Sequence, residues 1–158
     1  MKRGRTAFLK VAIFVIGFIT LGLCLFLLPR LAGHTAEMNP GFAYLQYPVI
    51  IGIYMTVVPF FIALYQSLKL LRLIEQKHAF SESAVIALKQ IKHCAAAIVI
   101  HYLMGVIFLG TQGALHPGIA LMGLGIMFTA FIIALFAAVL QEVLRNALEI
   151  KTENDLTV

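Results

Sequence analysis

Four long apolar segments, separated by polar ones, constrain the fold of this chain more than any other feature. They lie at about residues 8–28, 48–68, 94–111 and 118–140, and each is close to the ~20 residues that an α-helix needs to cross a bilayer. Hydrophobic residues make up 61% of the chain and charged residues 12%, against roughly 25% charged in a soluble domain. The sequence therefore predicts an all-α, polytopic membrane protein.

The distribution of positive charge predicts how the chain is oriented. Of the 12 Lys and Arg residues, all but Arg30 lie in the N-terminal segment, the central segment 69–93 or the tail 141–158. Cytoplasmic segments of membrane proteins carry such an excess of Lys and Arg. We therefore expect a single domain over residues 1–158, with four transmembrane helices in an up-down-up-down bundle and both termini cytoplasmic. We expect this domain in the plasma membrane.

The first two spans each carry a feature that needs interpretation. The first is longer than the apolar part of a signal peptide and is followed by no small-residue cleavage site, so we expect it to be retained. Lys10 is expected to extend toward the inner interface. Pro59 lies inside the second span and predicts a kink, because its ring removes a backbone donor.

The central segment 69–93 predicts the cytoplasmic tip of a helical hairpin. Residues 77–79 lack helical periodicity, which indicates a turn. Ser81 is expected to cap the next helix, because its hydroxyl can accept a free backbone N–H, and Glu82 is favourable in the first turn. The two helices would then extend past the membrane and present a docking surface.

The remaining segments predict a loop, a turn and a partly helical tail. Residues 29–47 are rich in proline and glycine, which predicts a loop. Residues 112–116 are long enough only for a turn. The tail begins with a helical spacing between Arg145 and Glu149, whereas residues 153–158 show no helical pattern.

Chemical motifs are scarce. All seven acidic residues lie outside the predicted spans, whereas ion-coupled carriers usually keep an acid within the bilayer. No hydrolase motif or phosphate-binding loop occurs, and His34, Glu37 and His116 lack metal-ligand spacing. We therefore expect no enzyme, no cofactor and no metal site. The positive charge is explained by topology, so we also expect no direct binding of nucleic acid.

Two polar residues of the third helix are candidates for an intramembrane site. His101 is the ionisable side chain deep in a span, and Gln112 shares its helical face. One interpretation is a site that senses protons or a ligand. The other is a neutral imidazole that hydrogen-bonds a neighbouring helix, and we favour it.

Three short segments carry a family resemblance. Residues 79–81 (AFS), 88–92 (LKQIK) and 153–158 (ENDLTV) resemble a bacterial family catalogued as domain of unknown function 2975, the YoaS-like four-span membrane proteins. The resemblance implies a multi-pass protein of the bacterial inner membrane. It also implies a small helix-turn-helix transcription regulator as a partner, because such regulators are often encoded beside family members. No catalytic or ligand residues are defined for the family, so none is carried over.

Two functions from different classes follow. The first is a regulatory or scaffold protein that binds a cytosolic partner through the tip and tail, with these candidate residues: Arg72, Glu75, Lys77, Phe80, Ser81, Lys89, Lys92, Glu153, Asn154, Asp155 and Leu156. The alternative is a transporter or channel component with a path between the second and third spans, lined by Tyr54, Tyr65, Gln66, His101 and Gln112.

The fourth span carries a pattern of small residues. Ala130, Ala134 and Ala138 recur at every fourth position, a spacing that lets helices approach closely. Packing within the chain is the first interpretation of this pattern, and a homodimer is the second.

Overall fold

The computed structural model describes residues 3–156, and they are helical except for short connections. The elements are α1 (Arg3–Gly22), a π-helix η1 (Leu23–Leu27), α2 (Leu28–Met38), a 3₁₀-helix η2 (Pro40–Leu45), α3 (Gln46–Glu75), α4 (Glu82–Thr111) and α5 (Pro117–Leu156). Four helical segments are long and apolar enough to cross a membrane, at residues 4–38, 40–75, 82–111 and 117–156. The predicted all-α fold with four membrane helices is confirmed.

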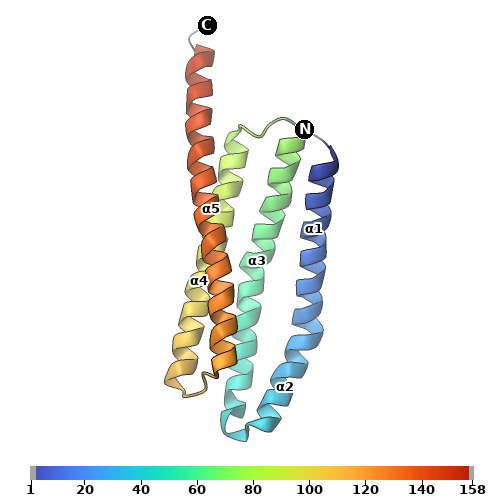
Figure 1. The fold of residues 1–158 in the computed structure, drawn as a ribbon, viewed down its shortest axis with the longest axis vertical. Coiled ribbons are helices and arrows are strands. Elements are labelled where there is room, and N and C mark those ends of the chain that lie inside the picture. The colour runs from blue at the N-terminus through green and yellow to red at the C-terminus, as the bar shows by residue number, and fades with distance from the viewer. Residues whose placement is uncertain (1–2, 157–158) are drawn as a thin grey trace.

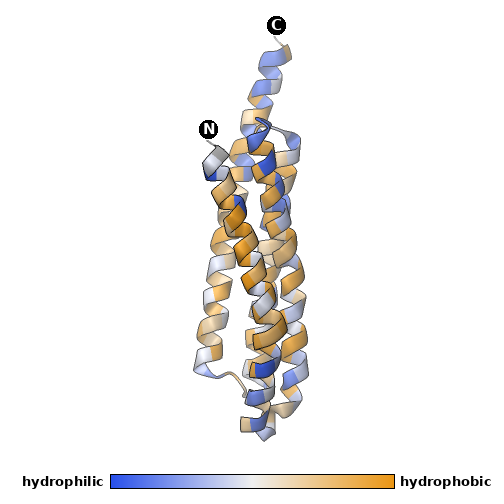
Figure 2. Ribbon diagram, turned by 90° about the vertical axis from the view of Figure 1, so that its right-hand side faces the viewer, coloured by the Kyte–Doolittle hydropathy of each residue, from blue (hydrophilic) through white to orange (hydrophobic). Residues whose placement is uncertain are grey.

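Each long helix packs against its neighbours in the sequence. The most extensive packing joins α4 to α5 and α3 to α4, whereas α1 touches α3 over a smaller area. Figure 1 shows the helices alternating in direction, with the tip between α3 and α4 at the same end as the start of α1. Hydrophobic residues fill the middle of the helices, and hydrophilic residues gather toward the ends (Figure 2).

Small residues bring α4 and α5 close together. Gly123, Ala130 and Ala137 are buried on α5, and their seven-residue spacing places them on one face of the helix. A Cβ added at Gly123 would lie 3.3 Å from Cγ2 of Val106 on α4, so this face packs directly on α4. Without a large hydrophobic driving force in lipid, such close van der Waals contact is what holds membrane helices together.

The segment between the first two spans is more regular than its proline and glycine content predicts. The expected loop over residues 29–47 is wrong for most of its length, because α2 and η2 occupy it. Pro29 does not break the chain: it closely follows the π-helix in a run that is helical from Arg3 to Met38, where the Leu28 amide bonds the Leu23 carbonyl. The preceding π-helix is anchored from outside by the Tyr54 hydroxyl, which donates to the Cys24 carbonyl at 2.8 Å.

The tail also differs from its sequence pattern. The segment 153–158 was expected to be non-helical, but α5 continues to Leu156, and residues 157–158 lie outside the described part. Local pairing supports this extension: Arg145 Nε donates to Glu149 at 3.2 Å. The long preceding helix supplies the nucleus, so each added residue gains a backbone hydrogen bond at little cost.

The tip has the predicted local structure. The chain leaves α3 after Glu75, turns with Lys77 at φ 61°, and re-enters a helix at Glu82. The Ser81 hydroxyl accepts a hydrogen bond from the Ala84 amide at 3.4 Å, and Ser81 itself is extended, as an N-cap requires. The predicted turn and cap are both confirmed.

Candidate functional site

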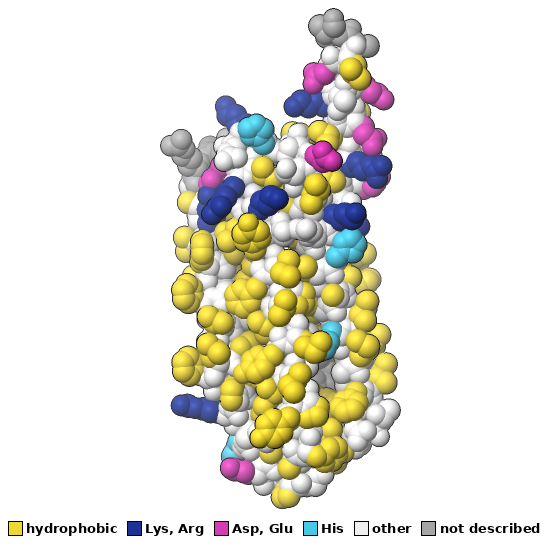
Figure 3. Space-filling view, turned by 180° about the vertical axis from the view of Figure 1, so that it is seen from behind, with side chains coloured by type: hydrophobic (Ala, Val, Ile, Leu, Met, Phe, Trp, Pro, Cys, Tyr) yellow, Lys and Arg dark blue, Asp and Glu magenta, His cyan; other side chains and the backbone are white. Residues whose placement is uncertain are grey.

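Charged side chains gather at one end of the molecule. Figure 3 shows Lys, Arg, Asp and Glu concentrated around the tip and the projecting end of α5, with a broad hydrophobic zone below them and few charges at the opposite end. This arrangement follows from the topology, because the start of α1, the tip and the end of α5 all lie on the same side of the hydrophobic zone. The molecule therefore has one polar, charge-rich end.

The tip residues predicted to bind a partner fall into two groups. Arg72, Lys77, Phe80 and Lys89 are exposed, and the Phe80 side chain is 58% exposed. An exposed aromatic residue among cations is typical of a protein-binding surface. Ser81 and Lys92 are only partly accessible, and the Ser81 hydroxyl is already used by the helix cap.

Glu75 is engaged within the chain. Its Oε2 lies 2.6 Å from Nζ of Lys10, and about a third of each side chain is exposed. Lys10 comes from the second turn of α1, so this ion pair joins the start of α1 to the last turn of α3. Sequence reasoning placed Lys10 near the interface but missed its partner, because 65 residues separate the two.

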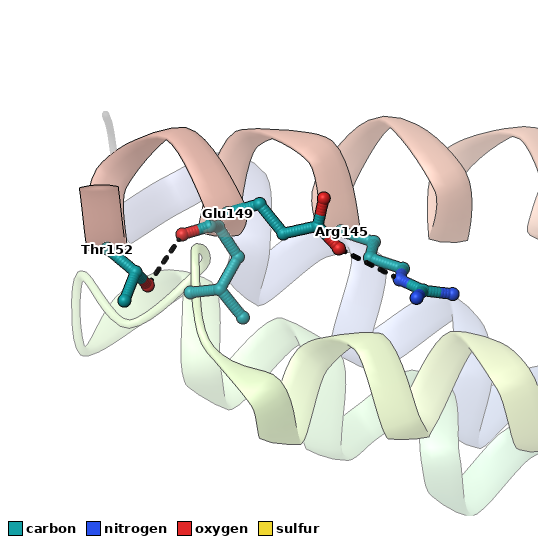
Figure 4. A network of polar contacts seen from close by, with 4 residues as sticks. Arg145, Glu149 and Thr152 are labelled. Atoms are coloured by element: carbon teal, nitrogen blue, oxygen red, sulfur yellow. Dashed lines mark hydrogen bonds and ion pairs between the residues drawn. The ribbon is translucent and has the colours of Figure 1, made fainter. Parts of the chain in front are cut away.

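The tail residues lie along the end of α5, which extends past the tip (Figure 1). All residues from Glu149 to Leu156 are exposed, and Leu156 is 82% exposed. Figure 4 shows the polar contacts of this end: Arg145 pairs with Glu149, and the Thr152 hydroxyl donates to the Leu148 carbonyl at 2.9 Å. The four predicted tail residues, 153–156, thus sit on the last exposed turn of a helix.

A pair of amides joins α3 to α4 below the tip. The Gln66 side chain is 8% exposed and donates to Oε1 of Gln90. Among the described residues, Oε1 of Gln66 and Oε1 of Gln141 are buried acceptors without a partner. The amide nitrogen of Gln66 is therefore bonded across the two helices, whereas its buried oxygen carries the cost of an unmade hydrogen bond.

The two intramembrane candidates do not lie together. Nε2 of His101 lies 3.5 Å from the position that a Cβ on Gly52 would occupy, so the imidazole faces α3. Gln112 instead caps the end of α4, where its Oε1 accepts a hydrogen bond from the Tyr44 hydroxyl at 2.9 Å. Gln112 therefore lies at the C-terminal end of α4, which it joins to η2.

The residues of the predicted path do not share a cavity. One hollow is a shallow dent on α3 that includes Tyr65. The other is a groove of about 480 Å³ between α3, α4 and α5, and its lining is apolar except for Ser67 and Thr129. Tyr54, Gln66, His101 and Gln112 line neither hollow, so these two hollows give the transporter alternative no support.

No cluster of metal ligands forms within residues 3–156. Groups of three or more His, Cys, Asp or Glu side chains able to hold a metal ion are absent from this part of the chain. The described cysteines, Cys24 and Cys94, are both free thiols.

Four apolar helices and one charge-rich end define a small multi-pass membrane protein. The chain belongs to a family described as "Protein of unknown function (DUF2975)", whose model matches residues 30–158. It is 49% identical, over 160 residues and the full length of both chains, to the "Uncharacterized membrane protein YoaS" of Bacillus subtilis strain 168. No solved structure matches it. The family resemblance is confirmed, and the chain is a multi-pass bacterial membrane protein.

Proposed function

We propose that this chain is a membrane-anchored regulatory or scaffold protein that binds a cytosolic protein through its tip and tail. The observation that carries this function is the gathering of exposed tip and tail residues at one end of the molecule (Figure 3). The excess of Lys and Arg at this end favours a cytoplasmic location. The hydrophobic zone below it provides the anchor in the lipid bilayer.

The surface offers two kinds of contact to a protein partner. Phe80 supplies an exposed aromatic side chain on the tip, and Arg72, Lys77 and Lys89 are exposed cations of the same segment. The end of α5 adds acidic side chains at Glu153 and Asp155. A surface with both signs of charge steers a partner with the complementary pattern and fixes its orientation.

A small helix-turn-helix transcription regulator is the partner that the family resemblance implies. Holding such a regulator at the membrane would restrain it from its operator without any chemistry in the bilayer. The cations at the tip contact the regulator in this scheme and not the DNA.

The experiment compares partner retention by two variants from opposite ends of the molecule. The tip variant carries Arg72→Gln, Lys77→Gln, Phe80→Ala and Lys89→Gln, and the control carries Arg30→Gln at the outer end. Affinity-tagged proteins are purified from gently solubilised membranes, and the cytosolic proteins that they retain are quantified. Accessibility of a single engineered cysteine checks that both variants keep their orientation.

We expect the wild-type protein and the Arg30→Gln control to retain the same cytosolic protein. The tip variant should lose at least about tenfold of it, which corresponds to ~1.4 kcal/mol of binding energy. Equal retention by the tip variant and the control would exclude the tip as the binding surface. Retention of no cytosolic protein by the wild type would count against the function itself.

A further inference from the structure

We propose that a second copy of this chain packs along α5, through a seam of residues of which the fold leaves all but the half-buried Ala147 exposed. The cytosolic part of this α5 seam consists of Leu140, Val143, Ala147, Ile150 and Asn154, at alternating spacings of three and four residues. That is the spacing of core positions in helices that wind around each other. The α5 seam is a different surface from the tip, although it shares Asn154 with the predicted tail residues, and the inference does not require the cytosolic partner.

The α5 seam is apolar where it should meet water. Val143 and Ile150 are each 60% exposed, and both lie beyond the predicted end of the fourth span at residue 140. The adjacent face of α5 is already used, because Leu144 and Leu148 are half-buried at helical positions that continue the buried face of Ala130 and Ala137. α5 thus has two apolar faces, and the fold of a single chain covers one of them. An uncovered apolar face is typical of an interaction site.

The same spacing continues into the membrane. Its positions there are Ile119, Met122, Ile126, Thr129, Ile133 and Phe136. Those from Met122 to Ile133 form one wall of the apolar groove of about 480 Å³, with α4 as its floor and α3 as its other wall. The groove and the cytosolic part of the seam therefore lie on the same side of α5. A helix that packs in the groove would therefore also pack along the cytosolic part of the seam.

Three features identify the occupant as a second copy. The membrane holds two copies of one chain parallel and at the same depth, so each seam residue can meet its own counterpart across a two-fold axis. The β-branched residues Ile119, Ile126 and Ile133 recur at every second core position, which favours a pair of helices. Asn154 occupies a later core position of the same kind, and asparagine there favours a parallel dimer in register.

Charged side chains lie both beside the α5 seam and opposite it. Lys151 and Glu153 occupy the two edges of the seam. The ion pair of Arg145 and Glu149, at 3.2 Å, lies on other sides of the helix, as does Thr152 (Figure 4). Helical spacing places Arg145 and Thr152 opposite the seam, where they provide matched controls.

Cysteine crosslinking tests this arrangement in purified protein reconstituted into lipid vesicles, without any other protein. Single cysteines are introduced in a background without the two native ones, as Val143→Cys and Ile150→Cys on the seam and as Arg145→Cys and Thr152→Cys opposite it. Oxidation should give a band at twice the 17.4 kDa of one chain for the two seam variants, with little for the two controls. Equal yields at all four positions, or no dimer at any, would overturn the inference.

A second measurement guards against a cysteine variant that fails to fold. Single-molecule photobleaching in vesicles should show mainly two copies per spot for the wild type and for Thr152→Glu. Ile150→Glu should shift the distribution to single copies, because it places like charges opposite each other at a core position. Single copies in the wild type, or two copies in Ile150→Glu, would argue for a seam that faces no second chain.

Discussion

Lys10 and Glu75 join the start of the first helix to the last turn of the third, with Nζ and Oε2 2.6 Å apart. The contact matters because α1 packs on the other helices less extensively than α3, α4 and α5 pack on one another. Each side chain is only about a third exposed, so solvent screens this pair less than a fully exposed one. We infer that it fixes the position of α1 beside the tip.

A double-mutant cycle of Lys10→Met and Glu75→Gln should reveal a coupling of about 1 kcal/mol, at the upper end of the range for accessible pairs. The measurement is reversible unfolding in mixed detergent micelles. Arg145→Met and Glu149→Gln provide the control cycle, because each of those side chains is 62% exposed and their coupling should be only ~0.3 kcal/mol. Equal couplings in the two cycles would show that the Lys10–Glu75 pair does no more than a surface pair.

Ser81→Ala should destabilise the start of α4 by about 1 kcal/mol, because the Ala84 amide loses its side-chain acceptor. Hydrogen exchange of the amides at residues 82–86 should become faster, with little change in the middle of the helix. Ser83→Ala is the matched control, since Ser83 is exposed in the first turn of α4 but is not the capping residue. Unchanged exchange in Ser81→Ala would mean that the tip is held by packing alone.

Gly52→Leu should destabilise the packing of α3 on α4 by about 1–3 kcal/mol, the usual cost of overpacking. A Cβ at Gly52 reaches only ordinary contact with Nε2 of His101, at 3.5 Å, so Gly52→Ala should be tolerated, whereas the larger leucine collides. Adding His101→Ala should recover part of the loss. Gly105→Leu serves as the control, because nothing lies within 4 Å of its added Cβ.

Gln66→Leu should destabilise the protein by about 1 kcal/mol, because it removes the hydrogen bond to Gln90. The double variant Gln66→Leu/Gln90→Leu should be about as stable as Gln66→Leu, because Gln90 is exposed and water satisfies its amide once Gln66 is replaced. Unfolding in mixed micelles distinguishes these outcomes. A double variant less stable than Gln66→Leu would show that this amide pair contributes more than its hydrogen bond.

Much of the fold was predictable because its causes are local. The four spans depend on runs of apolar residues long enough to satisfy every backbone group inside a bilayer. The turn and the helix cap at the tip depend on a few adjacent residues, of which Ser81 is the last. The prediction failed at residues 29–38 and 153–156, where proline or polar residues suggested an end to the helix. A helix that is already formed extends through such residues at little cost, and at Pro29 the chain stays helical by widening to a π-helix over Leu23–Leu27.

The candidate surface was predictable in location but not in detail. Charge counting placed the tip and tail at one end, yet it could not show that Glu75 pairs with Lys10 or that Ser81 is used within its own helix. The intramembrane set was less accurate, since Gln112 lies at the C-terminal end of α4.

Residue order and hydropathy were thus sufficient for an all-helical membrane protein with four spans, because lipid imposes the same requirement on every such segment. The pairing of Lys10 with Glu75, the contact of His101 with Gly52 and the open side of α5 became visible only in the folded chain. These features depend on which faces of distant helices meet. Side-chain packing between helices decides which faces meet, and no local sequence pattern encodes it.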